Sequence, residues 1–261
     1  MLLAIDVGNT ETKLGCFDPD SDDLLHYWRV TTDTHRTADE YGVFFTQLFA
    51  AAHVPLSEIS GVVIASVVPR LDHALAEVSQ KFFHVEARFL HGNEQSLVAL
   101  KTHHAHEAGA DLVAAAIGAR ERYGAPLIVV SYGTASAFVA ISEAGEFIGA
   151  AIAPGINTSI DALIGRTAKL PQIRLEAPSH AIGRNTVEAL QSGFIYGFVG
   201  QTEGIVARMR AELGSHARVI ATGGLADVVA RHSTVIDRVD PNLSLIGLRL
   251  FYRSLHPTHG K

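Results

Sequence analysis

The sequence has very little cysteine and no long uninterrupted apolar segment. Cys16 is the only cysteine among 261 residues, so the chain cannot form an internal disulfide or a cysteine-rich metal site. A single thiol also fits a protein of a reducing compartment. No apolar run approaches the length of a membrane-spanning helix, and the short apolar N-terminus carries no basic region. We therefore expect a cytoplasmic protein without a membrane partner.

The sequence also lacks an excess of positive charge. It carries 21 lysines and arginines against 27 aspartates and glutamates, a formal net charge of −6, and it has no basic run. Nucleic acid is therefore not an expected partner. Hydrophobic residues make up 48% of the chain and charged residues 18%, which is enough apolar material for the core of one large domain or two smaller ones.

The first fifteen residues combine an apolar strand with a turn that suits phosphate. Residues 2–5 form an apolar run, and after Asp6 and a Gly-Asn-Thr turn the alternation at 13–17 predicts a returning strand. Gly8 lets the backbone approach an anion, and successive turn amides form an anion-binding concavity. Lys13 adds a positive charge, and Asp6 would hold Mg²⁺ or a water bound to it. The alternative is an ordinary tight hairpin, for which these turn residues are also typical.

The first half of the chain continues as an alternation of strands and helices. A third strand is expected at residues 24–30, which completes an antiparallel meander. Thr37 and Glu40 form a capping box at the start of an amphipathic helix. This order is typical of an α/β domain. The further elements expected are a strand at 61–65, a helix at 71–82, a strand at 86–90 and an alanine-rich helix from 111 to 122.

The second half repeats the design of the first. Residues 125–141 contain an apolar run, a polar residue, Gly133-Thr134 and an alternating strand, in the same order as residues 2–17. Two such halves predict duplicated actin-like domains at 1–118 and 119–261, which face each other across a nucleotide cleft. The remaining elements expected are a strand at 146–153, a helix at 158–163, a loop at 169–178, a long helix from Asn185 to 213, a strand at 218–221, a Thr222-Gly223-Gly224 turn before a helix, a strand at 235–237 and a helix at 243–255.

A loop rich in histidine interrupts the pattern before the alanine-rich helix. His103, His104 and His106 invite a metal site, but their alternating spacing with one neighbouring glutamate is a weak ligand signal. A solvated loop that leads into the helix is the better interpretation. Asp111 follows at the helix start, where it either stabilises the helix dipole or acts as a general base at the mouth of a cleft.

An ordered set of short motifs runs through the chain: DVGNT at 6–10, RTADEY at 36–41, SVVP at 66–69, GAD at 109–111, GTA at 133–135, AIAPGI at 151–156, QSG at 191–193, ATGGLA at 221–226 and LIGL at 245–248. Together they resemble the type III pantothenate kinases, over nearly the full length. The resemblance implies an actin-like (ribonuclease H-like) fold and a homodimeric kinase. Such an enzyme transfers the γ-phosphate of ATP to the primary hydroxyl of pantothenate, the first step of coenzyme A biosynthesis.

The resemblance also implies cofactors and site residues. The cofactors are Mg²⁺ and a monovalent cation, K⁺ or NH₄⁺, and Asp111 is the general base that takes the hydroxyl proton. The resemblance makes Thr186 a pantothenate contact, whereas the residues alone favour a purely structural role for it, in the first turn of a helix capped by Asn185. The implied ATP contacts are Asp6, Val7, Gly8, Asn9, Thr10, Glu11, Thr12, Lys13, Thr134, Gly223 and Gly224, and the implied pantothenate contacts are Gly109, Ala110, Asp111, Leu112 and Thr186.

Three positions depart from the family pattern. Leu112 stands where the family has a pantothenate-binding arginine, and leucine offers neither charge nor donors. Ser131 stands where the family has an aspartate on the monovalent cation, and a neutral serine is a poorer cation ligand. Thr102 stands at the position of a substrate-contacting tyrosine. Two alternatives therefore stay open: a kinase of the same fold for another small hydroxyl compound, and a catalytically silent ligand-binding regulator.

Overall fold

The chain folds into two compact units. The computed structural model describes residues 1–19, 21, 23–92, 97–167 and 170–256. Unit 1 contains Met1–Gly118 together with the described residues from 243 onward, and unit 2 contains Ala119–Asn242. The final helix therefore groups with the first unit, whereas the sequence placed it in a domain spanning 119–261. Residue 169, where the predicted loop begins, lies outside the described residues.

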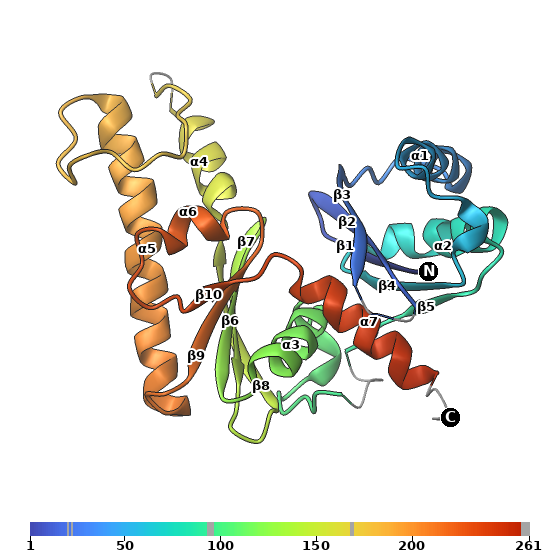
Figure 1. Ribbon diagram of the computed structural model, residues 1–261. Coiled ribbons are helices and arrows are strands. Elements are labelled where there is room, and N and C mark those ends of the chain that lie inside the picture. Colours follow the sequence, from blue (N-terminus) through green and yellow to red (C-terminus); the bar gives the residue numbers. More distant parts are fainter. Residues whose placement is uncertain (20, 22, 93–96, 168–169, 257–261) are drawn as a thin grey trace. The chain divides into compact units, whose positions relative to one another are not determined.

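Unit 1 is built on a five-stranded mixed sheet in the order β3-β2-β1-β4-β5 (Figure 1). Strands β1 (Leu2–Val7), β2 (Glu11–Phe17) and β3 (Leu24–Thr31) form an antiparallel meander. Strands β4 (Gly61–Ser66) and β5 (Ala87–Phe89) continue the sheet parallel to β1. In this register Asp6 lies opposite Lys13 on one side and Ala65 on the other.

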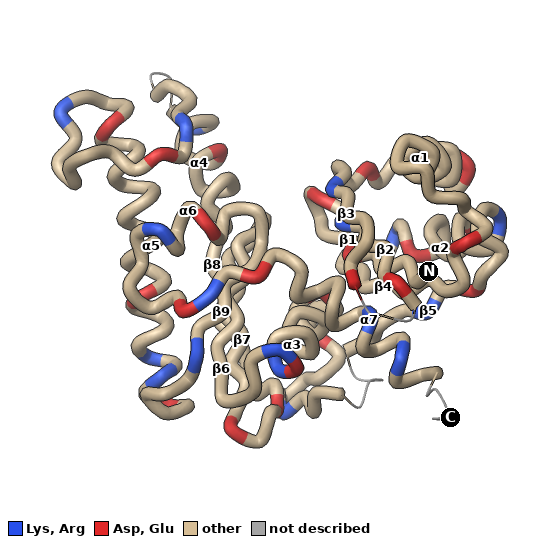
Figure 2. Tube along the Cα trace, viewed as in Figure 1, with Lys and Arg blue, Asp and Glu red and all other residues tan. Residues whose placement is uncertain are grey.

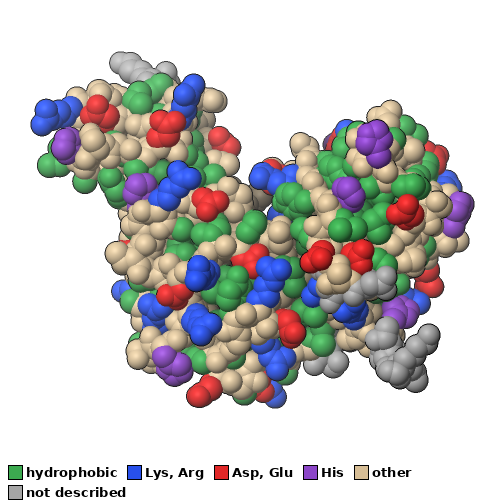
Figure 3. Space-filling model, viewed as in Figure 1, with side chains coloured by type: hydrophobic (Ala, Val, Ile, Leu, Met, Phe, Trp, Pro, Cys, Tyr) green, Lys and Arg blue, Asp and Glu red, His purple; other side chains and the backbone are tan. Residues whose placement is uncertain are grey.

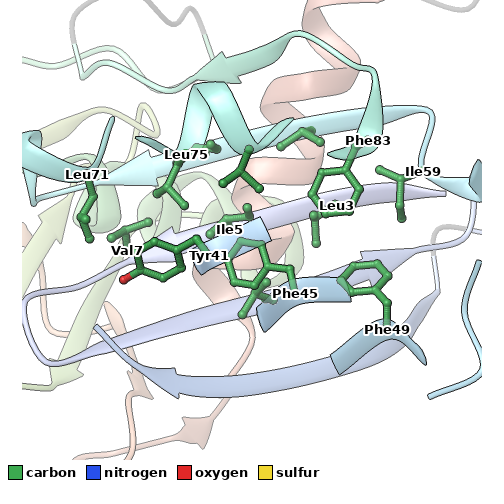
Figure 4. Packing of buried hydrophobic residues seen from close by; sticks show 14 of the residues in the cluster. Leu3, Ile5, Val7, Tyr41, Phe45, Phe49, Ile59, Leu71, Leu75 and Phe83 are labelled. Carbon is green, nitrogen blue, oxygen red and sulfur yellow. The ribbon is translucent and has the colours of Figure 1, made fainter. Parts of the chain in front are cut away.

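One face of this sheet carries the main core of unit 1. Because successive strand residues point to opposite faces, the odd-numbered residues of β1 face one way and Asp6 faces the other. Helices α1 (Ala38–Ala51) and α2 (Pro69–Val78) cover the odd-numbered face. A π-helical turn at Ser79–Phe83 extends α2. The packed side chains include Leu3, Ile5, Val7, Tyr41, Phe45, Phe49, Leu71, Leu75 and Phe83 (Figure 4).

Helix α7 (Leu243–Leu255) packs on β1 and β4, and its Leu245 also lies against Gly15 on the Asp6 side of the sheet. Its Leu245 and Leu248 are fully buried, which explains why the end of the chain belongs to unit 1. Helix α3 (Ala110–Tyr123) starts in unit 1 and crosses α7 closely, with the backbone of Ala114 against Gly247. Short 3₁₀ turns at Leu56–Glu58 and Ala105–Glu107 complete the unit.

Unit 2 repeats this sheet topology in the order β10-β9-β6-β7-β8. Its meander consists of β6 (Leu127–Tyr132), β7 (Ala135–Ile141) and β8 (Phe147–Pro154). Strands β9 (Arg218–Thr222) and β10 (Arg238–Val239) add to β6 in parallel, as β4 and β5 add to β1. The predicted duplicated α/β architecture is confirmed, with the same strand order and directions in both sheets.

The helices of unit 2 pack a second core. Helix α5 (Thr186–Leu213) runs the length of the sheet (Figure 1), and α4 (Ile156–Ile164) and α6 (Ala226–Ala230) pack into the same cluster. The strand expected at 235–237 is wrong, since pairing with β9 begins at Arg238. Val235 and Ile236 pack against the core as single apolar side chains instead.

The surface carries charge of both signs in both units. Acidic and basic residues are scattered along the trace in both units (Figure 2), and they are interspersed among hydrophobic side chains on the face shown in Figure 3. Among the described residues, no helix combines the length and apolar character needed to cross a bilayer.

Candidate active site

Asp6 is a buried carboxylate near the end of the central strand of unit 1. It is 5% exposed. Its Oδ2 accepts a hydrogen bond from Ser244 Oγ of α7 at 2.6 Å and another from Lys13 Nζ of β2 at 3.3 Å. Strand β2 and the C-terminal helix therefore meet on one carboxylate oxygen. These bonds fix the orientation of the group.

Lys13 is held as a cation beside this carboxylate. Burial alone would lower the pKa of the Lys13 ammonium, but the charge and hydrogen bond of Asp6 outweigh it, so the pKa is raised above its ordinary value. Tyr27 and Asp111 add smaller contributions in the same direction. A permanent positive charge in this position suits the binding of a phosphate group.

Asp111 lies in the first turn of α3, and its acid–base properties are strongly altered. Burial raises the pKa of the Asp111 carboxyl to about 6, and the negative charge of Asp6 adds to the shift. Its Oδ1 accepts the Leu112 N–H at 2.8 Å, which opposes the shift, as does the charge of Lys13. A carboxylate with a pKa near neutrality is well matched to general-base catalysis.

The turn between β1 and β2 is held by Thr32, a residue that the sequence analysis did not single out. Gly8 N–H donates to Glu11 O at 3.0 Å, and a Cβ on Gly8 would lie 2.9 Å from that oxygen. Thr32, just beyond β3, donates through Oγ1 to Gly8 O at 2.7 Å and also contacts Thr12 Oγ1 at 2.9 Å. Asn9 is exposed at the turn, where its amide is available to a phosphate.

Some of the predicted ATP contacts already have protein partners. The Glu11 carboxylate binds the Arg29 guanidinium through Oε2 at 3.2 Å and Oε1 at 2.5 Å. Its side chain thus joins β2 to β3. Thr10 O accepts the Thr32 N–H at 2.9 Å. Val7 and Thr12 are buried.

In unit 2 the structure brings two of the predicted turns together. Gly223 has φ +96°, and a Cβ there would overlap the backbone carbonyl of Tyr132, which directly precedes Gly133-Thr134. Thr134 O accepts bonds from Gly155 N at 3.0 Å and Thr158 Oγ1 at 2.7 Å. The turns at 133–134 and 223–224 thus form one compact surface, and their contact with ATP stays a prediction.

The other predicted residues occupy less distinctive places. Gly109, Ala110 and Leu112 surround Asp111 at the start of α3. Thr186 is exposed in the first turn of α5, where the Asn185 side chain caps the helix through Glu188 N at 2.9 Å. The Thr102 hydroxyl is buried without a hydrogen-bond partner among the described residues.

The residues present fit Mg²⁺ better than they fit a monovalent cation. Among the described residues, no group of three or more His, Cys, Asp or Glu side chains could hold a metal ion. Mg²⁺ is commonly held by one or two carboxylates with phosphate oxygens and waters, and Asp6 offers such a carboxylate. Ser131 is half-buried on β6 beside Thr222 of β9. At the position expected for the monovalent cation it offers only a neutral hydroxyl.

Ser244 is a site residue that sequence reasoning missed. It lies 238 positions from Asp6 in the sequence. No local pattern indicates that a serine in an amphipathic helix donates a hydrogen bond to a carboxylate so far away in the chain. The LIGL motif at 245–248 was the nearest available signal.

Replacing Ser244 tests this contact. Ser244→Ala removes a buried hydrogen bond to a charged group, so we expect a loss of about 1.5–3 kcal/mol in the free energy of unfolding, measured by urea denaturation. Ser244→Thr, which keeps the hydroxyl, should recover most of it. The control Ser254→Ala removes only a bond to a helix carbonyl and should change stability by less than about 0.5 kcal/mol. Equal losses in both alanine variants would contradict the assignment.

Asp111 makes stability depend on pH in a predictable direction. Its pKa is about 6 in the folded chain against an ordinary 3.8, so its protonated form stabilises the fold and this contribution is lost as pH rises through 6. Asp111→Asn mimics the neutral form. We therefore expect it to raise the free energy of unfolding by about 1–3 kcal/mol at pH 8 and to change it little below pH 4. Thermal unfolding at both pH values measures this, and an equal gain at each would contradict it.

The chain matches known proteins over most of its length. A family model described as type III pantothenate kinase matches residues 2–208. A type III pantothenate kinase of Moorella thermoacetica is 47% identical over 252 residues, covering 97% of this chain and 98% of that protein. One of Myxococcus xanthus is 45% identical over 256 residues, covering 98% and 99%.

A solved structure shows the same fold at much lower identity. A protein from Sinorhizobium meliloti, described as a proposed 2-dehydro-3-deoxygalactonokinase, superposes with a TM-score of 0.65 at 16% identity, covering 100% of this chain and 99% of that one. This likeness supports the two-unit α/β fold, and the extensive sequence matches define the family. The chain belongs to the type III pantothenate kinase family.

Proposed function

We propose that this protein transfers the γ-phosphate of ATP to the primary hydroxyl of pantothenate, in the cytoplasm, as the first step of coenzyme A biosynthesis. The observation that carries the proposal is the arrangement in unit 1, where Asp111, with a pKa of about 6, lies under the influence of the fixed Asp6–Lys13 ion pair. Phosphoryl transfer needs charge neutralisation and positioning, together with a base for the attacking hydroxyl. The family relationship supplies the acceptor.

The residues of unit 1 have separate tasks in this reaction. The hydroxyl oxygen attacks the γ-phosphorus, the bond to the leaving ADP oxygen breaks, and Asp111 takes the hydroxyl proton. Lys13 and the turn amides around Gly8 and Asn9 neutralise phosphate charge. Asp6 would hold Mg²⁺, directly or through water, and the ion would supply further charge neutralisation at the phosphates. The proposal does not require a monovalent cation at Ser131.

Leu112 is the observation that favours a second candidate. Without a charged side chain next to the general base, the same machinery could serve a small hydroxyl compound that has no carboxylate. The two candidates differ only in the acceptor, so a panel of acceptors separates them. A catalytically silent regulator is a third reading, which multiple-turnover release of ADP with any acceptor would exclude.

An assay of coupled ADP release tests the reaction and the base together. With pantothenate, the wild-type chain should turn over many times, with kcat/KM falling below a pH of about 6 as Asp111 becomes protonated. Asp111→Asn should lower kcat by about 10²- to 10⁴-fold while ATP binding, measured by calorimetry, is retained. The control Asp161→Asn, at an exposed position of α4, should leave turnover unchanged. Undiminished turnover in Asp111→Asn would remove Asp111 as the base.

We also propose that the protein is a homodimer. The family resemblance suggests this, and unit 2 exposes apolar side chains on its edge strand β8, with Ile152 70% and Ile148 39% exposed. Sedimentation velocity at micromolar concentration should show a species of twice the 27.9 kDa chain mass. Ile152→Lys should shift the distribution toward the monomer, and a wild-type chain that sediments only as a monomer would contradict the proposal.

A further inference from the structure

A cavity of about 430 Å³ opens in unit 1 beside the general base. Its volume lies within the range of roughly 300–1,000 Å³ that is typical of small-molecule sites. Three segments form its wall: the end of β4, the residues after β5 and the loop that leads into α3. The lining residues that matter here are Ser66, Val67, His91, His106, Glu107 and Gly109.

The sheet topology connects this cavity with the phosphate hairpin. Strands β1, β4 and β5 are parallel, so their carboxyl ends meet at one edge, and ligands of open α/β sheets bind at such edges. Ser66 lies directly opposite Val7 in the sheet register. A Cβ on Gly109 would lie 2.7 Å from Asp111 Oδ1 and 3.7 Å from Val67 Cγ1. The Asp111 carboxylate therefore lies against Gly109, which is one of the residues that line the cavity.

The side chains around the cavity indicate what it could bind. His91 is stacked on Phe89, with ring centroids 6.3 Å apart and an angle of 13° between the rings. His106 packs edge-on against His104, with centroids 5.9 Å apart. These contacts orient two imidazole rings in the wall of one cavity. Each ring has an N–H group that can donate to an anionic oxygen.

We propose that this cavity binds the acid end of the acceptor, with His91 and His106 donating hydrogen bonds to its carboxylate. The proposal rests on the proposed function, because pantothenate carries its phosphorylated hydroxyl at one end and a carboxylate at the other. Leu112 contributes no charge beside Asp111, and the described lining of the cavity includes no lysine or arginine. Among the described side chains of this wall, the two histidines are the ones that can become positively charged, and the hydroxyl of Ser66 is a further neutral donor.

Glu107 sets a limit on the ligand. It lines the same cavity, and its negative charge opposes any anion there, most strongly one that brings two negative charges, so the histidines must outweigh it for a single carboxylate. The cavity therefore suits a monocarboxylate better than a dicarboxylate or a phosphate ester. In this proposal the carboxylate accepts from the imidazoles and the hydroxyl at the other end of the acceptor extends toward Asp111.

Comparing two acceptors isolates the carboxylate contact. Pantothenol has the same reactive hydroxyl as pantothenate but an alcohol in place of the carboxylate. In steady-state assays, His91→Ala and His106→Ala should each raise KM for pantothenate about tenfold, as expected for a lost hydrogen bond to a charged group, with kcat within about twofold. KM for pantothenol should stay unchanged in both variants. His106→Gln, which keeps an N–H donor, should recover part of the pantothenate affinity.

Controls separate this proposal from the function on which it rests. His73→Ala, at an exposed position of α2 outside the cavity wall, should leave both KM values unchanged. If the wild-type chain does not phosphorylate pantothenate, the proposed function fails. Calorimetric binding of pantothenate and pantothenol then shows whether the cavity recognises a carboxylate. Unchanged pantothenate KM in the histidine variants, equal losses for both acceptors, or wild-type binding that does not depend on the carboxylate would overturn the proposal.

Discussion

The hydrogen bonds that converge on Asp6 Oδ2 are the constraint on which unit 1 depends. A buried carboxylate is stable only when other groups compensate for its lost hydration. Lys13 supplies the charge from the neighbouring strand, and Ser244 supplies a hydroxyl from the last helix. This arrangement fixes the orientation of Asp6 and stabilises the positive charge of Lys13. The same pair influences the ionisation of Asp111, through repulsion by Asp6 and attraction by Lys13.

The C-terminal helix links this electrostatic arrangement to the packing of the fold. Helix α7 contributes Ser244 to Asp6, and a few residues later its Gly247 touches the backbone of α3. Because Asp111 lies in the first turn of α3, helix α7 contacts both elements that carry the two carboxylates. A shift of α7 would therefore change the Asp6 contact and the α3 packing together. The need to bring these elements together gives a physical reason why the chain returns to unit 1 after completing unit 2.

Local patterns in the sequence predicted most of the fold, and the long-range contacts explain the remainder. The repeat of apolar run, turn and alternating strand was sufficient to predict two similar units, because strand order follows from short connections. The grouping of α7 and the role of Ser244 could not be predicted, since both depend on contacts between the two ends of the chain. The histidine loop was interpreted as solvated. The spacing of its histidines gave no sign that His106 lines the same cavity as His91, which follows β5 earlier in the chain.

The departures from the family pattern are best understood as a question of where positive charge is supplied. An arginine next to the general base would attract the acceptor, but it would also stabilise the Asp111 carboxylate and lower its pKa. With Leu112 in that position, burial and Asp6 keep the pKa of Asp111 at about 6, so its carboxylate, the proposed base, binds a proton more readily. Groups that bind the carboxylate of the acceptor are then better placed farther from Asp111, where they change its pKa less. In our proposal the imidazoles of His91 and His106 take this role, in the wall of a cavity that also includes Gly109, the residue against which Asp111 Oδ1 lies.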